Sequence, residues 1–99
     1  MTAPYTFYAA SALRWYFKHE TKPDHFFSRA IETNWETCEK VVKECDPDMI
    51  ALIREVYLSA DTVGDAVYEA AKKHEIHQDN IWTMLTIVEK HFAKERGLI

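Results

Sequence analysis

The sequence predicts an all-helical protein, a small bundle of about five helices. Two observations support this: the 99 residues include only two glycines and three prolines, and apolar residues recur at intervals of three and four. No segment shows the alternation of apolar and polar residues that is typical of a strand. The length suits one domain with a single modest core, so we expect residues 1–99 to form one unit.

The first predicted helix begins after Pro4 and ends near His19. Its apolar side is expected to carry Tyr8, Ala12, Trp15 and Tyr16, with Phe7 left open as a further member.

A second helix is expected after the segment ETKPD, because Thr21 can cap it, Pro23 suits its first turn and Asp24 favours the positive helix end. It extends to Cys45, and its apolar stripe comprises Phe27, Ala30, Ile31, Trp35, Cys38, Val41 and Val42. Residues 1–45 therefore form an aromatic-rich helical pair. Its rings are expected in the core, or alternatively in a dimer seam, because they are many for so small a domain.

Three further helices are predicted in residues 46–99. Asp46 caps the first, Pro47 occupies its first turn, and its apolar face comprises Met49, Leu52, Ile53, Val56 and Tyr57. Asp61 or Thr62 caps the next, whose apolar side comprises Val63, Ala66, Val67, Ala70 and Ala71. The last begins near Gln78, stops near Arg96 at Gly97, and has in register Ile81, Met84, Leu85, Val88 and Phe92.

Composition and charge exclude several classes of function. The formal net charge of −4 is spread evenly, which counts against strong autonomous binding to nucleic acid. No stretch has the features of a signal peptide or of a membrane span, so we expect a cytoplasmic protein with no membrane partner. No nucleophile elbow, phosphate-binding loop or dinucleotide fingerprint occurs, and we therefore predict neither an enzyme nor a cofactor.

The cysteines and histidines raise the question of zinc. Cys38 and Cys45 lie about 10.5 Å apart along a helix, too far for a disulfide or for joint ligation. His74 and His77 flank a turn. We therefore predict no metal site and two free thiols in or near the core.

The segment AAKKHEIHQDNIW, residues 70–82, has the spacing of a helix-turn-helix. Such a motif needs a small residue in its first helix, often a glycine at the turn, and a branched apolar residue early in the second helix. Ala71, Glu75 and Ile81 occupy these positions, and Ile76 would plug the turn. Because glutamate replaces the glycine, either Glu75 adopts a left-handed conformation or the turn differs. The bundle is thus expected to end in a C-terminal helix-turn-helix.

Residues 46–99 resemble region 4 of the sigma-70 family and the small phage-type and Gram-positive transcription regulators that use this domain. The residues that carry the resemblance are Met49, Ile53, Val56, Tyr57, Leu58, Ala70, Ala71, Ile76 and Ile81. It implies that the helix beginning near Gln78 enters the major groove of double-stranded DNA. Binding would be weak for a monomer and would gain from dimerisation or from RNA polymerase. The family usually has leucine at the position of His74, so the resemblance implies a partly buried, hydrogen-bonded histidine there. Residues 1–45 lie outside the resemblance.

Candidate DNA contacts follow from this resemblance. The expected base-facing residues are His77, Gln78, Asn80, Thr83 and Thr86, and the expected phosphate contacts are Lys72, Lys73, Lys90 and Lys94. Outward positions that often carry lysine or arginine in the family hold Trp82, Thr83 and Thr86 here. Strong electrostatic attraction to DNA is therefore missing.

Two functions remain open. The first is a DNA-binding transcription regulator of bacterial or phage type. The alternative is a small helical adaptor for protein–protein interaction that keeps the shape of a helix-turn-helix without binding DNA. Its expected interface residues are Tyr8, Trp15, Tyr16 and Trp82. A neutral or acidic face over residues 77–87, with the lysines elsewhere, would favour the adaptor.

Overall fold

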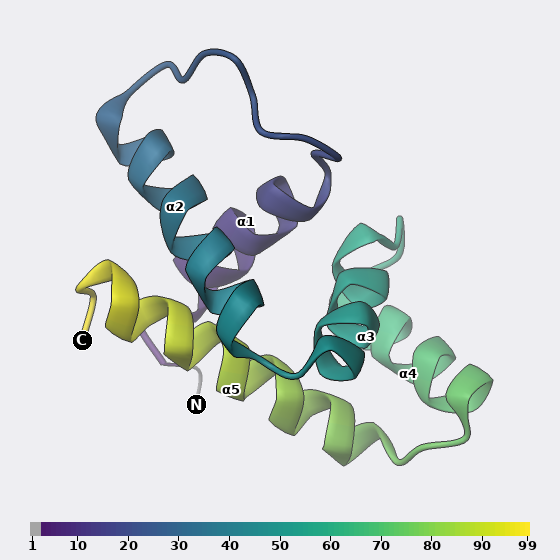
Figure 1. The fold of residues 1–99 in the computed structure, drawn as a ribbon. Coiled ribbons are helices and arrows are strands. Elements are labelled where there is room, and N and C mark those ends of the chain that lie inside the picture. Colours follow the sequence, from purple (N-terminus) through teal and green to yellow (C-terminus); the bar gives the residue numbers. More distant parts are fainter. Residues whose placement is uncertain (1–2) are drawn as a thin grey trace.

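The computed structural model describes residues 3–99, and among these residues it contains five helices and no strand. The helices are α1 (Thr6–Phe17), α2 (Arg29–Glu44), α3 (Pro47–Leu58), α4 (Val63–His74) and α5 (Gln78–Arg96). The predicted all-helical class and the number of helices are confirmed. Figure 1 shows α5 along the lower edge of the molecule, with the other four helices above it.

The core lies where α5 meets the other helices. α5 packs against all four of them, and α1 also packs against α2 and α3. The predicted stripe of α5 is buried at Ile81, Leu85, Val88 and Phe92, whereas Met84 only borders the core. The Cα radius of gyration, 13.3 Å, is that of one compact domain of this length. Residues on both sides of position 45 therefore share one core.

The start of α2 differs from the prediction. Ser28 is its N-cap, and the Ser28 hydroxyl accepts a hydrogen bond from the backbone N–H of Ile31 at 3.2 Å. The expected start at Thr21 and Pro23 lies in the loop before it, because Phe26 packs outside any helix against Trp35. Two members of the predicted stripe are exposed instead of buried: Phe27 and Ala30.

The buried face of α1 also differs from the prediction. It is formed by Ala9, Ala12, Leu13 and Phe17, so the helix is turned by about one residue from the expected orientation. Phe7 points outward and is 84% exposed. The prediction placed the large rings of α1 in the core. In the structure, the small side chains of Ala9 and Ala12 let α1 approach its neighbours closely.

The starts of α3 and α4 agree with the prediction. The Asp46 carboxylate accepts from the Asp48 N–H at 2.8 Å, and the Thr62 hydroxyl accepts from the Asp65 N–H at 3.3 Å. Each cap satisfies a backbone donor that the first turn of a helix leaves without a partner. The buried face of α3 includes Ile50, which the prediction omitted, while Met49 and Leu52 are only partly buried.

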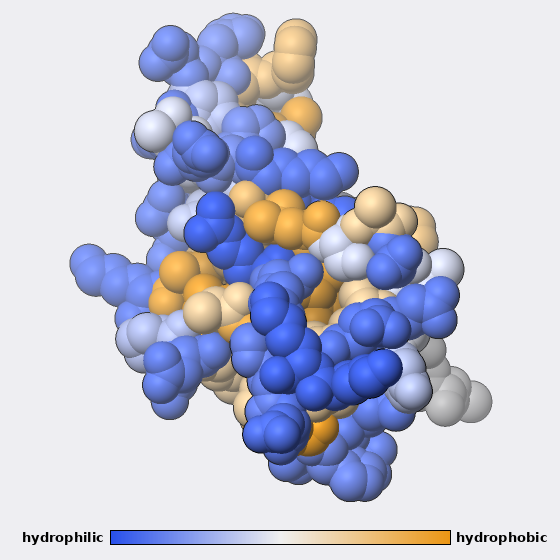
Figure 2. Space-filling view, turned by 90° about the vertical axis from the view of Figure 1, so that its right-hand side faces the viewer, coloured by the Kyte–Doolittle hydropathy of each residue, from blue (hydrophilic) through white to orange (hydrophobic). Residues whose placement is uncertain are grey.

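The surface carries both hydrophilic and large apolar side chains. Figure 2 shows hydrophilic atoms over most of one face and apolar atoms gathered near its middle. No helix within residues 3–99 combines the length and the apolar character needed to span a membrane. The large apolar side chains that are exposed are Phe7, Tyr8, Phe27, Leu58, Tyr68, Trp82, Ile87, Leu98 and Ile99.

Candidate functional site

The connection between α4 and α5 is a tight turn of three residues. Glu75 follows α4 in the left-handed conformation, with φ 55° and ψ 44°. The carbonyl of Ala71 accepts the N–H groups of both Glu75 and Ile76, the latter at 3.0 Å. Ile76 packs against the core, and His77 caps α5. Of the two alternatives for Glu75, the structure has the left-handed one.

The five expected base-facing residues are all exposed, but three of them already use polar groups within the helix. Nδ1 of His77 accepts the Asp79 N–H at 3.1 Å, which closes the first turn of α5. The hydroxyls of Thr83 and Thr86 donate to carbonyls one turn earlier, at 2.9 and 3.0 Å. The amides of Gln78 and Asn80 are the exposed groups best suited to reading a base edge.

The four expected phosphate contacts are divided between the last turn of α4 and the far half of α5. Lys73 pairs with Glu55 of α3 at 3.0 Å, and this contact is the largest cause of a lowered pKa of the Glu55 carboxyl. Lys72 is exposed on α4. Lys90 and Lys94 are exposed on the far half of α5, about 18 Å or more along the axis from Gln78. From residue 77 to 87, Asp79 is the only formally charged side chain.

Three of the four expected interface aromatics lie on α1, where Tyr8 and Trp15 line one pocket beside α2, and the fourth, Trp82, lies apart on α5. Trp15 and Tyr16 are half-buried around Trp35, with ring centroids 5.6 and 4.7 Å from it. Burial and Glu39 raise the pKa of Tyr16 to about 12. The Tyr8 hydroxyl is hydrogen-bonded to the Asn34 side chain, whereas Trp82 stands on α5 and is 42% exposed.

A groove beside Trp82 is lined by residues of four helices and by the segment before α1. Its volume is about 520 Å³. The lining residues are Ala3, Tyr5, Thr6, Phe7, Ala10, Tyr57, Val63, Trp82, Leu85, Thr86 and Glu89. Most of this lining is apolar, and two exposed rings from different helices, Phe7 and Trp82, border it. The groove is therefore a candidate binding site.

A buried carboxyl group lies in this groove. Glu89 is 9% exposed and accepts a hydrogen bond from the Tyr57 hydroxyl. Burial raises the pKa of Glu89, although the bond from Tyr57 opposes the shift. Burial and Glu89 also raise the pKa of Tyr57. On the other side, Arg14 stacks over the Tyr57 ring at 5.7 Å and donates from Nε to the Tyr57 carbonyl at 3.3 Å.

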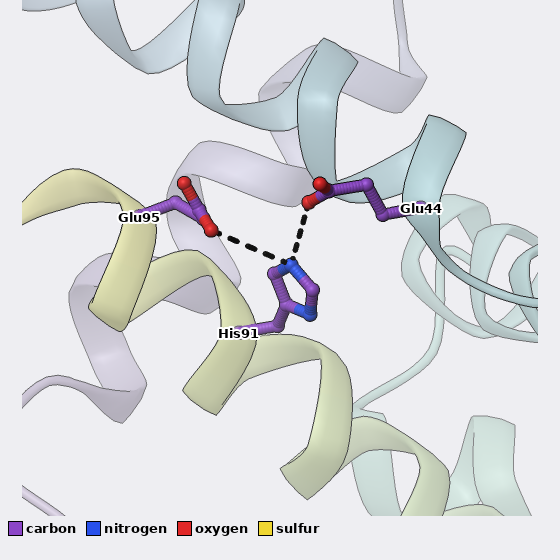
Figure 3. A group of neighbouring side chains, drawn as sticks. All are labelled: Glu44, His91 and Glu95. Atoms are coloured by element: carbon purple, nitrogen blue, oxygen red, sulfur yellow. Dashed lines mark hydrogen bonds and ion pairs between the residues drawn. The ribbon is translucent and has the colours of Figure 1, made fainter.

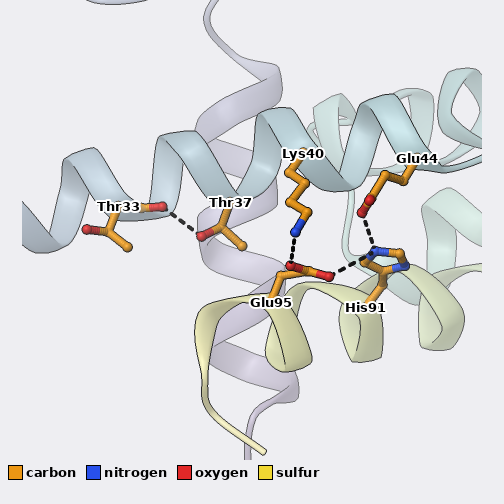
Figure 4. A network of polar contacts seen from close by, with 6 residues as sticks. All are labelled: Thr33, Thr37, Lys40, Glu44, His91 and Glu95. Carbon is orange, nitrogen blue, oxygen red and sulfur yellow. Dashed lines mark hydrogen bonds and ion pairs between the residues drawn. The ribbon is translucent and has the colours of Figure 1, made fainter.

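A polar cluster joins α2 to α5 on the opposite side of α5. Figure 3 shows Nε2 of His91 between two carboxylates, 2.9 Å from Glu44 and 3.9 Å from Glu95. Lys40 pairs with Glu95 at 2.6 Å, which lowers the pKa of that carboxyl. Figure 4 shows that the cluster continues the polar edge of α2, where Thr37 donates to the Thr33 carbonyl at 2.7 Å. The cluster fastens the C-terminal half of α5 to α2.

The structure places the residues considered for zinc binding in different surroundings. Within residues 3–99, the group with suitable ligand spacing is Glu44, His91 and Glu95, which the sequence reading did not single out. His74 is hydrogen-bonded as expected, to Glu55 at 3.0 Å, but it is exposed rather than partly buried. The free thiols agree with the prediction: Cys38 is buried, which raises its pKa to about 12, and Cys45 is half-buried.

Sequence reasoning missed Glu89 and Phe7 as groove residues. Glu89 lies four residues after Leu85 and three before Phe92, so its place beside the apolar stripe of α5 was readable from spacing. For Phe7, the sequence left open a place on the apolar side of the first predicted helix. The groove itself joins residues from opposite ends of the chain, and no local pattern indicates such a meeting.

Comparisons with models of protein families, with curated proteins and with solved structures find no match for this chain. The resemblance to sigma-70 region 4 therefore rests on the quoted residues alone.

Proposed function

We propose that this protein is a small helical adaptor that binds a segment of another protein in the groove between α1 and α5. The observation that carries the proposal is the placing of Phe7 and Trp82, which are 84% and 42% exposed and border one apolar groove. Exposed aromatic rings around an apolar cleft are typical of interface anchors.

The charge of the α5 surface supports an adaptor over a DNA-binding protein. Asp79 is the only formally charged side chain between residues 77 and 87, and Lys73 is held by Glu55. Non-specific DNA affinity comes from lysine and arginine on phosphates, and the N-terminal half of α5 has neither.

The test is a selection of short peptides from a randomised display library on the full chain. We expect enriched peptides whose binding perturbs the backbone NMR signals of groove residues. Phe7→Ala and Trp82→Ala should each weaken binding about 10-fold or more. Phe27→Ala is the matched control, because Phe27 is equally exposed but outside the groove. Enriched peptides that map elsewhere, or none at all, would exclude the adaptor.

A second candidate is the DNA-binding transcription regulator, acting with RNA polymerase or as a homodimer. The exposed amides of Gln78 and Asn80 on the first turn of a helix after a three-residue turn favour it. Binding to random and genomic duplexes, measured by anisotropy between about 50 and 200 mM salt, tests it. Affinity that falls steeply with salt would support DNA binding, and no binding at low salt would rule out autonomous recognition.

A further inference from the structure

We infer that the groove selects its partner segment through an arginine side chain, whose guanidinium would contact the Glu89 carboxylate while its stem lies between Phe7 and Trp82. This inference rests on the proposed adaptor function and adds the chemistry of the partner.

The first support is the position of Glu89 itself. Glutamate is almost never buried unless it is paired, yet Glu89 is 9% exposed inside an apolar groove. Its one hydrogen bond comes from the Tyr57 hydroxyl, which is neutral. Across the described part of the chain, no lysine, arginine or histidine lies within 4.0 Å of the Glu89 carboxylate. Among the described residues, Glu89 therefore has no cationic partner.

The nearby cation does not fill this role. Arg14 contacts Tyr57, but it stacks on the ring and bonds the backbone carbonyl instead of reaching Glu89. The Tyr57 ring thus contacts the Arg14 guanidinium, and the Tyr57 hydroxyl donates a hydrogen bond to Glu89. A cation that pairs with Glu89 would therefore come from outside the described residues, through the groove that Glu89 lines.

The walls of the groove suit a guanidinium better than an ammonium. Tyr5, Phe7 and Trp82 line the groove with aromatic rings, and such surroundings suit a planar and weakly hydrated guanidinium. The methylene stem of the arginine can pack between the rings of Phe7 and Trp82. A lysine ammonium would lose more hydration in the same place.

A segment of a partner protein fits the surroundings better than a small amine. Phe7 is exposed over most of its surface and stands at the rim, so a ligand confined to the groove would leave that ring in water. A chain that passes over Phe7 and Trp82 and inserts one arginine covers both rings and meets the acid. Charge complementarity and the apolar rim therefore point to the same occupant.

The experiment uses the peptides selected on the full chain. We expect the enriched sequences to share an arginine beside apolar residues. Replacing that arginine by citrulline, which keeps the shape and removes the charge, should weaken binding about 30-fold or more by calorimetry. Glu89→Gln should cause a similar loss, and combining both changes should add little to either. Replacing the arginine by lysine should retain only part of the affinity.

Two controls separate loss of charge from loss of structure. Glu69→Gln removes an exposed acid from α4 and should leave affinity unchanged. Glu89→Gln keeps an acceptor for Tyr57, and an unchanged NMR spectrum away from the groove will show that it folds.

The outcomes are distinguishable. Peptides that bind at the groove without a shared arginine, with full affinity for Glu89→Gln, overturn this inference and leave the adaptor function standing. No peptide at the groove overturns both. Sedimentation that shows self-association lost in Trp82→Ala would make a second copy the occupant and would also overturn the inference.

Discussion

Glu75 is the residue at which local geometry and residue type disagree most. It has φ 55°, a conformation that costs an ordinary side chain about 1–2 kcal/mol relative to a right-handed one. The position ends α4 and directs the chain into α5, so the turn keeps this conformation despite its cost. Gly97, which ends α5 with φ 81°, shows the residue that such a position favours.

Glu75→Gly should therefore stabilise the protein. Glycine removes the strain but loses more entropy on folding, so the net gain in the free energy of unfolding is expected to be about 0.5–1 kcal/mol. Urea denaturation followed by circular dichroism measures it. Glu75→Ala is the control, since it removes the carboxylate but keeps the strain. An equal gain in the alanine variant would assign the effect to charge.

The buried pair of Tyr57 and Glu89 makes stability depend on pH. Burial raises the folded-state pKa of Glu89 above the ordinary value of 4.5. Between these two pKa values the native state binds more protons than the unfolded chain, so the free energy of unfolding falls as pH rises. The stabilising effect of the protonated acid is complete below 4.5 and is lost as pH rises through the folded-state pKa.

Glu89→Gln should remove this component. We expect the difference in unfolding free energy between Glu89→Gln and the natural sequence to grow in favour of the variant from about pH 4.5 upwards. Urea titrations at several pH values between about 4 and 8 measure it. A difference that stays constant with pH would show that the carboxyl has the same pKa in the folded and unfolded states.

Tyr57→Phe tests the same pair from its other side. It deletes the hydroxyl that donates to Glu89 and leaves a buried carboxyl without this donor. The expected cost at neutral pH is about 1–3 kcal/mol. Repeating the change in the Glu89→Gln background should cost less, because a neutral amide is easier to leave without a partner than a charge. Equal costs in both backgrounds would contradict this coupling.

Among the elements, α3, α4 and α5 could be predicted closely and α2 could not. Asp46, Thr62 and Gly97 each combine a favoured cap residue with an apolar stripe on one side. For α2, Thr21 and Pro23 are equally good local signals, but Phe26 packs against Trp35 and keeps the preceding segment non-helical. Ser28 is a favoured cap residue as well, so local signals alone do not decide between the two starts.

The true start of α2 gives a direct test. Ser28→Ala should destabilise the protein by about 1 kcal/mol, because it removes the acceptor of the Ile31 N–H. Thr21→Ala, at the start expected from sequence, should change stability by less than about 0.5 kcal/mol. Thermal unfolding of the two variants compares them. The reverse order would restore the earlier helix start.

At the scale of the whole molecule, α5 packs against each of the other four helices. Sequence periodicity predicted the buried positions Ile81, Leu85, Val88 and Phe92 correctly, whereas Met84 is only partly buried. The meeting of Glu89 with Tyr57, or of His91 with Glu44, depends on how distant segments dock, and a single sequence does not encode that in any local pattern.

A buried and an exposed phenylalanine, Phe92 and Phe27, offer a test of the single core. Phe92 is fully buried, so Phe92→Ala should cost about 3–5 kcal/mol and lower the stability of all five helices together. Phe27 is 92% exposed, and Phe27→Ala should change stability by less than about 0.5 kcal/mol. Denaturation followed by both circular dichroism and NMR measures this. Loss of α5 alone in Phe92→Ala would contradict a single core.

The separation of Trp82 from the other two tryptophans has an optical consequence. Trp15 and Trp35 share one cluster, with ring centroids 5.6 Å apart, and Trp35 is 3% exposed. Trp82, which is 42% exposed, borders the groove. Its fluorescence should lie at longer wavelength and be quenched by acrylamide, whereas that of Trp35 should be shielded. A ligand in the groove should shift the emission of Trp82 and protect it from acrylamide, and should leave the emission of Trp35 unchanged. Unfolding should change the emission of both residues.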